Sequence, residues 1–457
     1  MLYYLTFYAT AAMLGLLWRY AFRQGDARPT LRFVVGAGIG ALALWMWRSS
    51  EPTVPFSDFT VAYYPAGRLV LEDLPRLFQR CWDTPVCGFV NIPIVAFLFT
   101  PFSILTLRHA QWLFLGFSLT CLVLSLGLLW SIAERTRARR WAILSLFALN
   151  GPLIYSLKEG NLTHCALLLL VAGVVCLDRG WERSAGLWFA LAAVIKLPLL
   201  LFGVYFFGTR RWQVVWGYGA TVAALSCASL GYAGWASHAD WYREVIQPFS
   251  KQGLTAFNVQ SVEGLLLRLQ DGAALYDWKV VPVSSDIKTI GRAATLLLLA
   301  VSAVLFLRHP GVRPRETMYV DLSMVLCLAL IISPISWTHY YLLLLLPLSL
   351  YVGNRLPMPQ AGPWPILVGL AILLASPPVI FPWAEGASVG VWQKLLLSHY
   401  LAGALLLWAL LAAARWLVAD VRRLHLVPSM GEESARRDNR RMHLAEPDDS
   451  YDQRAAG

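Results

Sequence analysis

Long apolar runs, separated by short polar or basic segments, limit how this chain can fold. Runs such as 110–131 reach the length of about 20 residues that a helix needs to cross the hydrocarbon core of a bilayer. The predicted spans include 33–47, 110–131, 141–157, 162–177 and 318–332. Only 14% of the residues are charged, against about 25% in an average soluble domain. We therefore expect an all-α polytopic membrane protein, with a transmembrane unit over 1–418 and a disordered cytoplasmic tail over 419–457.

The basic residues fall mainly in the short segments between these runs, which is the usual signature of cytoplasmic loops. Placing every basic cluster on one side predicts about eleven full spans, with the N-terminus outside and the C-terminus inside. External loops are then expected at about 51–90 and 231–288. The first run, 2–18, lacks a basic leader and a cleavage site, so we interpret it as a retained helix. The net charge of +11 reflects topology and anionic lipids rather than nucleic acid.

Two runs do not read as straight spans. Residues 184–207 are interrupted at Lys196-Leu197-Pro198, and a straight helix there would place Arg210 and Arg211 outside. A re-entrant pair of half-helices keeps both ends inside, and broken helices at membrane depth usually line a cavity. Residues 91–107 contain two prolines, and we expect this run to lie in the outer interface or to re-enter.

Asp58 follows the second run, in the segment EPTVPFSDFTVAYYPAG, with Tyr63 and Tyr64 shortly after it. A carboxylate just outside a bilayer, beside aromatic side chains that exclude water, suits a general base acting on lipid-borne substrates. The alternative is an ordinary helix cap, with Ser57 or Asp58 as the N-terminal cap of a helix starting near Phe59.

Further polar side chains are expected to meet Asp58 on the outer face, and ionisable groups at membrane depth are functional candidates. Asn161 could instead cap a helix, and Glu159 could form a solvated pair with Lys158. Lys196 needs an anion, either a lipid phosphate or a carboxylate such as Glu159. The set comprises Lys158, Glu159, Asn161, His164, Lys196, Asn258, Gln260 and His339.

The seven cysteines show no metal-binding spacing. Five of them lie in apolar runs, where we expect them to be inert packing. Cys81 and Cys87 lie in the polar segment after Asp58, and if that segment is external they can form a small disulfide or remain two free thiols.

These motifs resemble those of the C-type membrane glycosyltransferases, and specifically of glycosyltransferase family 87, in family order over roughly residues 55–350. The matching stretches are SDFTVAYYPAG with Asp58, NIPIVAFLFTPFSIL, KEGNLTHCALLLL, GLWFALAAVIKLPLLLFGVYFFGTRRW with Lys196, NVQSVEGLLLRL and SPISWTHYYLLLLLP with His339.

The resemblance implies a C-type glycosyltransferase fold and an inverting, metal-independent transfer without a cofactor. A sugar, mannose in known members, would move from a polyprenyl-phosphate donor to a lipid- or glycan-linked acceptor. The reaction would take place on the extracytoplasmic face of a bacterial plasma membrane. Asp58 would be the single base, and Lys196 and His339 would neutralise the departing phosphate. Asn161, Tyr63 and Tyr64 would bind the donor, and Glu159, His164, Asn258 and Gln260 are candidates for acceptor or loop contacts.

Two other readings remain open from the sequence. A transporter or flippase of lipid-linked sugars would show internal repeats with a broken helix in each half, whereas only one broken pair is visible. An arabinosyltransferase or an O-antigen ligase would share the general architecture and differ in its substrates.

Overall fold

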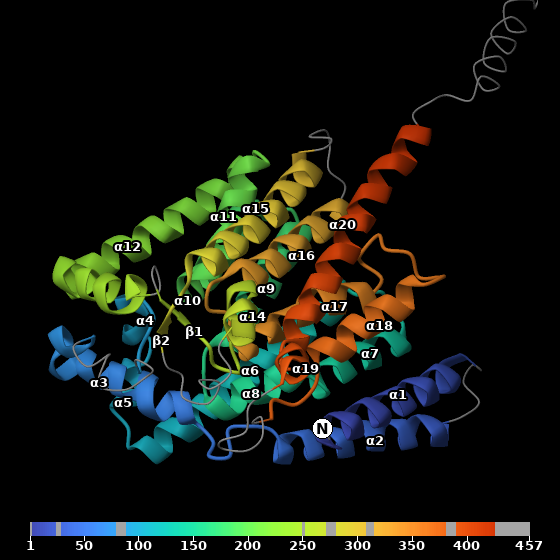
Figure 1. Ribbon diagram of the computed structural model, residues 1–457, viewed down its shortest axis with the longest axis horizontal. Helices are drawn as coiled ribbons and strands as arrows, with labels where there is room; N and C mark the ends of the chain where they lie inside the picture. The colour runs from blue at the N-terminus through green and yellow to red at the C-terminus, as the bar shows by residue number, and fades with distance from the viewer. Residues whose placement is uncertain are drawn as a thin grey trace, which may run out of the picture.

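The computed structural model describes residues 2–23, 29–78, 88–248, 252–270, 280–307, 315–380 and 390–425 (Figure 1). Cys81, Cys87 and residues 426–457 lie outside the described residues, so the predictions made for them stay predictions. Helices make up most of the described chain. The longer ones are α1 (Leu2–Arg23), α2 (Pro29–Ser49), α6 (Leu107–Ile132), α7 (Arg137–Ala148), α9 (Thr163–Asp178), α10 (Glu182–Ile195), α12 (Trp212–Trp241), α15 (Ser285–Leu307), α16 (Arg315–Ile332), α18 (Trp364–Ala375) and α20 (His399–His425).

Short elements connect the long helices and carry most of the polar side chains of interest. They are the π-helices η1 (Phe59–Tyr63) and η4 (Tyr242–Ile246), the 3-10 helices η2 (Leu74–Arg76), η3 (Leu197–Leu200) and η5 (Thr338–Leu344), and the α-helices α3 (Tyr64–Glu72), α4 (Pro93–Phe97), α5 (Thr100–Ser103), α8 (Gly151–Glu159), α11 (Leu201–Gly208), α14 (Val262–Gln270), α17 (Leu345–Val352) and α19 (Val391–Leu396). Strands β1 (Gln252–Leu254) and β2 (Val280–Pro282) pair antiparallel, with Gly253 opposite Val281.

Five described helices are long and apolar enough to cross a membrane. They are Pro29–Ser49, Leu107–Ile132, Trp212–Ile246, Ser285–Leu307 and His399–Leu417, and five shorter apolar helices accompany them. The chain is thus a mostly helical membrane protein, as the hydropathy predicts, with the small β1–β2 sheet as an addition. The number of spans, about eleven, stays a prediction.

Several predicted boundaries are wrong. Residues 141–157 do not form one helix, because α7 ends at Ala148 and α8 begins at Gly151, where Asn150 caps the new helix through its side chain. The segment 231–246, expected in a loop, continues α12 past a break at Gly234. Helix α20 runs to His425, so residues 419–425 are helical rather than part of a disordered tail.

The core is built around α9, α10, α16 and α17, which lie between the outer helices (Figure 1). Helices α10 and α12 approach closely because each places a glycine against the backbone of the other. A Cβ on Gly186 would lie 2.2 Å from the Val214 backbone oxygen, and a Cβ on Gly217 would lie 2.1 Å from the Arg183 backbone oxygen. Small residues at such crossings are usual where helices pack inside a membrane.

The interrupted run around Lys196 folds back on itself, as predicted. Helix α10 ends at Ile195, η3 and α11 follow, and the two ends of the pair meet. Arg211 Nη1 lies 3.9 Å from Glu182 Oε1, and Arg183 Nε donates to Gln213 Oε1 at 2.7 Å. Both ends of the hairpin therefore lie at the same level, with Lys196 at the far end.

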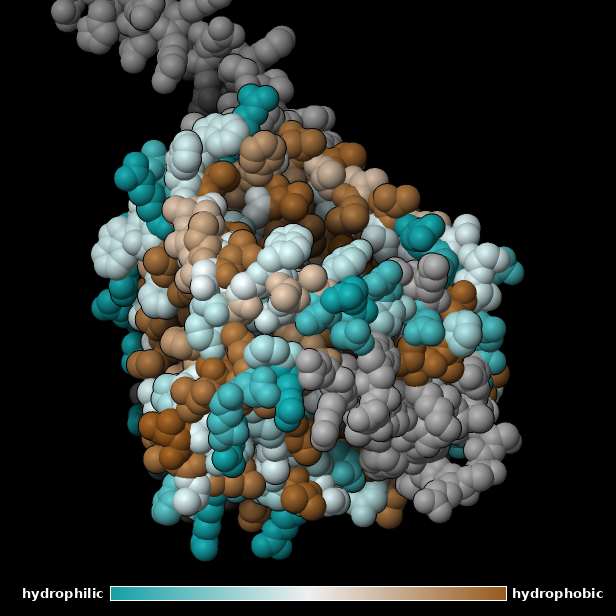
Figure 2. Space-filling model, turned by 90° about the vertical axis from the view of Figure 1, so that its left-hand side faces the viewer, coloured by the Kyte–Doolittle hydropathy of each residue, from teal (hydrophilic) through white to brown (hydrophobic). Residues whose placement is uncertain are grey.

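The surface around α12 is largely apolar. Figure 2 shows the face at the left of Figure 1, where brown side chains cover much of the surface and teal ones gather toward its lower part and edges. Trp212, Trp216 and Trp235 on α12 are exposed. Large exposed apolar areas mark contact with a membrane or a partner, which agrees with lipid around this helix.

Candidate functional site

Asp58 directly precedes the π-helix η1, and its side chain makes no capping hydrogen bond to that helix, so Asp58 is not a side-chain cap. The next residue, Phe59, is fully buried against Phe99, Phe102 and Phe114, which fixes the segment. The carboxylate of Asp58 is left half-buried at the edge of the helix bundle. Single π-turns are frequent at functional sites because they re-aim side chains.

Helix α8 supplies the second carboxylate, Glu159, at its last position. The helix stops there because Gly160 adopts a left-handed conformation, with φ 73°. A Cβ on Gly160 would lie 2.8 Å from the Cβ of Phe59, so the glycine also lets η1 dock on the end of α8. The docking brings together two carboxylates that are about a hundred residues apart in sequence.

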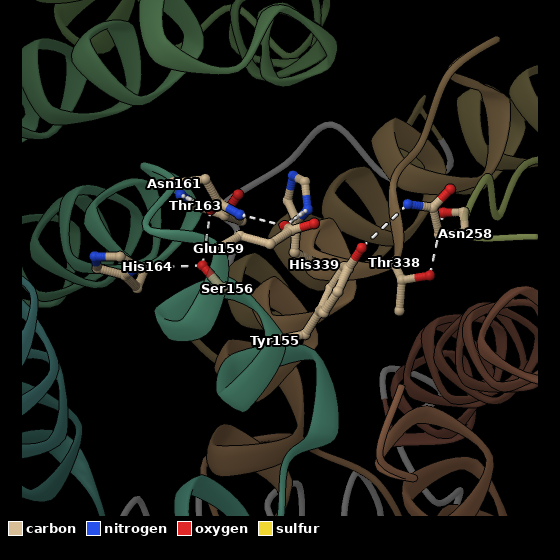
Figure 3. Close-up of polar contacts among 9 residues, drawn as sticks. All are labelled: Tyr155, Ser156, Glu159, Asn161, Thr163, His164, Asn258, Thr338 and His339. Carbon is tan, nitrogen blue, oxygen red and sulfur yellow. Dashed lines mark hydrogen bonds and ion pairs between the residues drawn. The ribbon is translucent and has the colours of Figure 1, made fainter. Parts of the chain in front are cut away.

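His339 joins these carboxylates from the start of η5. Asp58, Glu159 and His339 each place one oxygen or nitrogen within 4.8 Å of the others. His339 Nδ1 lies 2.8 Å from Glu159 Oε2, a close ion-pair contact whose angle departs from that of an ideal hydrogen bond (Figure 3). Asn161 Nδ2 donates to the same Glu159 oxygen at 2.9 Å.

A chain of polar contacts extends from Glu159 into the bundle (Figure 3). The Asn161 carbonyl oxygen accepts from the Ser156 hydroxyl at 2.8 Å, and His164 Nδ1 lies 3.1 Å from the same hydroxyl. Because Ser156 donates to Asn161, its oxygen accepts from His164, which requires the proton on Nδ1 of His164. His164 therefore supports Asn161 from behind instead of reaching the cluster itself.

Lys196 lies at the break between α10 and η3 and is 5% exposed. Its Nζ lies 4.3 Å from the centre of the Tyr340 ring, and its positive charge acts on both Asp58 and Glu159. No ion pair within 4.0 Å joins Lys196 to any residue of the described ranges, so the expected alternative of a strut to Glu159 is not seen.

Burial raises the pKa of both carboxylates of the cluster. Burial raises the pKa of Asp58, the charge of Glu159 raises it further, and His339 and Lys196 oppose the shift. Burial likewise raises the pKa of Glu159. Asn161 and His339 both contact one oxygen of Glu159, Oε2, whereas no hydrogen bond joins the Asp58 carboxylate to another described side chain. This difference makes Asp58 the stronger candidate for accepting a proton from a substrate.

Other predicted residues take different positions. Tyr63 is buried next to Asp58, but the Tyr64 hydroxyl turns away and donates to the Leu105 oxygen at 2.8 Å. Lys158 also turns away from Glu159 and donates to the Trp47 oxygen at 3.2 Å, so these two residues are no solvated pair. Adjacent helical residues point about 100° apart, which is why only one of each pair reaches the cluster.

The loop before α14 supports the site from the opposite side. Asn258 Nδ2 donates to the Tyr155 hydroxyl at 3.2 Å. The backbone oxygen of Asn258 accepts hydrogen bonds from the hydroxyl and the backbone N–H of Thr338 (Figure 3). Gln260 Nε2 donates to the Leu397 oxygen at 2.7 Å, a bond that holds the loop in place. Asn258 therefore lies at the rim of the cluster, and Gln260 lies behind it.

Sequence reasoning missed two aromatic residues of the site, Tyr155 and Tyr340. Tyr155 lies one turn before Glu159 on α8, and its ring lies 6.1 Å from that of His339. Tyr340 follows His339 and faces Lys196. The four-residue spacing from Tyr155 to Glu159 was a usable signal, since such residues share one face of a helix.

A largely apolar cavity of about 680 Å³ lies beside Lys196 and Tyr340. Its polar lining residues include these two side chains together with Asn91 and Glu244, and the walls come from η3, α11, η4 and the end of α16. A cavity with a few charged groups at one end and apolar walls suits a ligand with a polar head and a long hydrocarbon tail.

Asp58, Glu159 and His339 could also hold a divalent cation, since two carboxylates and an imidazole are suitable ligands. The nearby ammonium of Lys196 already supplies positive charge to both carboxylates. Whether a cation binds here is not decided by these residues alone, and metal independence stays a prediction.

Comparison with known proteins identifies the family. The sequence model of glycosyltransferase family 87 matches residues 89–334. The chain belongs to this family. The matched range includes Glu159, Lys196 and Asn258, whereas Asp58 and His339 lie outside it.

Two curated relatives come from Mycolicibacterium smegmatis. A polyprenol-phosphate-mannose-dependent alpha-(1-2)-phosphatidylinositol mannoside mannosyltransferase is 24% identical over 85% of this chain and 91% of its own length. A polyprenol-phosphate-mannose-dependent alpha-(1-2)-phosphatidylinositol pentamannoside mannosyltransferase is 29% identical over 83% of this chain and 82% of its own length. The protein is therefore a membrane glycosyltransferase of family 87, as its motifs predicted.

Proposed function

We propose that this glycosyltransferase moves a sugar, mannose by similarity to its relatives, from a polyprenyl-phosphate donor to a lipid- or glycan-linked acceptor. The observation that carries the proposal is the cluster of Asp58, Glu159 and His339 beside Lys196, which itself lines an apolar cavity. Asp58 can act as a base toward the acceptor, and Lys196 supplies positive charge for a phosphate. The apolar cavity can accommodate a prenyl chain.

Asp58 serves as the general base. It takes the proton from the acceptor hydroxyl as the oxygen of that hydroxyl attacks the sugar at C1. The bond between C1 and the phosphate oxygen breaks, and the phosphate leaves with the bonding electron pair. With a single base and no covalent intermediate, the configuration at C1 inverts. The raised pKa of Asp58 makes it a stronger base than an ordinary carboxylate.

Lys196 and His339 stabilise the leaving phosphate. Charge builds on the phosphate as its bond to C1 breaks, and the positive charge of Lys196, together with a hydrogen bond from the ring of His339, lowers the energy of that state. Glu159 holds Nδ1 of His339, so Nε2 of the ring is the nitrogen available to the phosphate. Glu159 is therefore proposed as a positioning residue for His339 rather than as an acceptor contact.

The proposed active site faces the extracytoplasmic side of a bacterial plasma membrane. The basic segments that separate the apolar runs support this orientation, since they are expected in the cytoplasm. A prenyl chain would enter the cavity sideways from the outer leaflet, past Leu200 and Val204 of the folded-back pair.

Transfer of radiolabelled mannose tests the proposal. Membranes containing the protein receive polyprenyl-phosphate-[14C]mannose together with a membrane lipid extract, and lipid-bound products are separated. We expect labelled product from this donor and none from GDP-mannose when synthesis of polyprenyl-phosphate-mannose is blocked. Passage of intact donor across vesicles without transfer would contradict the proposal and favour a flippase.

A further inference from the structure

A second cavity, of about 400 Å³, lies next to the site already described. It lies between α14, the first turns of α15 and the last residues of α16. Its lining includes Glu263, Lys288, Arg292, Leu296, Ile331 and Ile332. Ile332 also lines the large cavity of Lys196, so the two cavities adjoin at this residue.

The polar side of this second cavity carries two cations and one carboxylate. Lys288 and Arg292 are four residues apart on α15, so their side chains leave the same face of the helix. Glu263 lies across from them on α14, and burial raises its pKa while the charges of Lys288 and Arg292 oppose the shift. The three groups are therefore close enough to interact, and positive groups outnumber negative ones among them.

The excess of positive charge among these lining side chains suits an anionic ligand. A phosphate diester carries a single negative charge, whereas a terminal phosphate carries more at neutral pH. Arginine and lysine bind phosphate oxygens through charge-assisted hydrogen bonds. The Glu263 carboxylate can accept hydrogen bonds from hydroxyl groups, so the same cavity can bind a sugar or polyol attached to the phosphate.

The position of the cavity fits a lipid head group. On the proposed topology Lys288 and Arg292 lie on the outer side of the membrane. The positive-inside rule disfavours basic residues there unless they have a specific role. Leu296 and Ile331 line the adjoining apolar part, as acyl chains require. The loop before α14 is bonded to the segment that carries His339, since Ser261 Oγ donates to the Pro334 oxygen at 2.9 Å.

We infer that this second cavity binds the phosphate diester of the acceptor, an anionic glycolipid anchored in the outer leaflet. The inference rests on the proposed function and deepens it, because it assigns the acceptor a class and a place. The lipid phosphate contacts Lys288 and Arg292, and its glycan passes Ile332 to reach Asp58.

The test uses the purified full-length protein and a double variant, Lys288→Ala with Arg292→Ala. Native mass spectrometry measures binding of phosphatidylinositol, and of glycerophosphoinositol as the same diester without acyl chains. We expect the double variant to weaken phosphatidylinositol binding by at least about tenfold, since each lost contact is a charge-assisted hydrogen bond. Glycerophosphoinositol should compete only weakly, because it lacks the acyl chains.

Kinetics then distinguish an acceptor site from a site for a resident lipid. With phosphatidylinositol mannoside as the acceptor probe, the double variant should raise the acceptor KM about tenfold or more, with the donor KM and kcat near wild type. The matched control is Arg68→Ala with Arg76→Ala, which removes two exposed outer-side cations that pair with Glu72 and Asp73. The control should change none of these values.

Two results would overturn the inference. Wild-type binding of phosphatidylinositol by the double variant would show that the cavity is no anion site. Weakened binding with an unchanged acceptor KM would assign the cavity to a resident lipid. Lys288→Arg is the control for misfolding of the double variant. It keeps the positive charge and should therefore retain most of the phosphatidylinositol binding. The binding arm needs no sugar transfer, so failure of the proposed transferase activity would appear separately, as wild-type protein that binds phosphatidylinositol but forms no product.

Discussion

At the scale of single residues, Lys196 is the side chain whose environment is hardest to explain without a ligand. It is buried at a helix break, lies over Tyr340, and acts on two carboxylates without pairing closely with either. We expect Lys196→Ala to weaken donor affinity at least about tenfold, because a charge-assisted contact with the donor phosphate is lost. Titration with a polyprenyl-phosphate-sugar analogue measures the change.

Lys158→Ala is the matched control for that experiment. Lys158 is also buried, but it contacts the Trp47 and Ser50 oxygens at the end of α2. Its loss should lower the unfolding temperature and leave donor affinity intact. Unchanged donor affinity in Lys196→Ala, combined with lower stability, would make Lys196 a structural residue and place the donor phosphate elsewhere.

Glu159→Gln separates the charge of Glu159 from its hydrogen bonds. The charge of Glu159 raises the pKa of Asp58, so its removal lowers that pKa. Asp58 must be deprotonated to act, and the acid limb of the pH–rate profile should therefore move to lower pH. We also expect a smaller kcat, because His339 loses its charged partner. Glu72→Gln, a change on the exposed surface, should leave the profile unchanged, and an acid limb that moves upward would contradict this electrostatic account.

Metal removal tests whether sugar transfer depends on a divalent cation bound by the cluster. Because Lys196 supplies positive charge beside Asp58 and Glu159, we expect EDTA to leave transfer unchanged after dialysis. Loss of activity that Mg²⁺ or Mn²⁺ restores would instead indicate that Asp58, Glu159 and His339 bind a cation.

At the scale of elements, the hydropathy pattern predicted α2, α6, α9 and α16 closely, and the Lys-Leu-Pro break located the fold-back. It missed the break between α7 and α8, although Asn150-Gly151-Pro152 is a strong helix-start signal. Apolar periodicity reports burial and does not distinguish one helix from two short ones.

The close crossing of α10 and α12 gives a prediction with its control on one helix. Gly217→Ala places a methyl group against the Arg183 backbone, and we expect a loss of about 1–3 kcal/mol in unfolding free energy from overpacking. Gly219→Ala meets nothing within 4 Å and should be neutral or slightly stabilising. Thermal unfolding in detergent compares the two variants, and equal stabilities would contradict the packing described here.

The site itself was predicted in part. Asp58, Lys196 and His339 stood out because charged groups in apolar surroundings are rare. The opposite orientations of Tyr63 and Tyr64, and the turn of Lys158 away from Glu159, depend on which helix face meets the cluster. That information comes from the docking of η1 on α8, a contact between distant segments that no local pattern contains.

At the scale of the whole molecule, the orientation in the membrane decides where the chemistry takes place. We expect the cytoplasm to face the basic segments and the outside to face Asp58 and the start of α15. Single cysteines at Ser285→Cys and Ser434→Cys, in a background without the native cysteines, should react with an impermeant reagent from opposite sides of the membrane. Labelling of both from the same side would overturn the proposed topology.

The central claim is that Asp58 is the base of a sugar transfer from a polyprenyl phosphate. The decisive measurement is single-turnover transfer of labelled mannose by Asp58→Asn, alongside donor binding by the same variant. We predict that Asp58→Asn binds the donor like the wild type and transfers roughly a hundred- to ten-thousand-fold more slowly. Transfer at close to the wild-type rate would contradict the account and make Glu159 the candidate base.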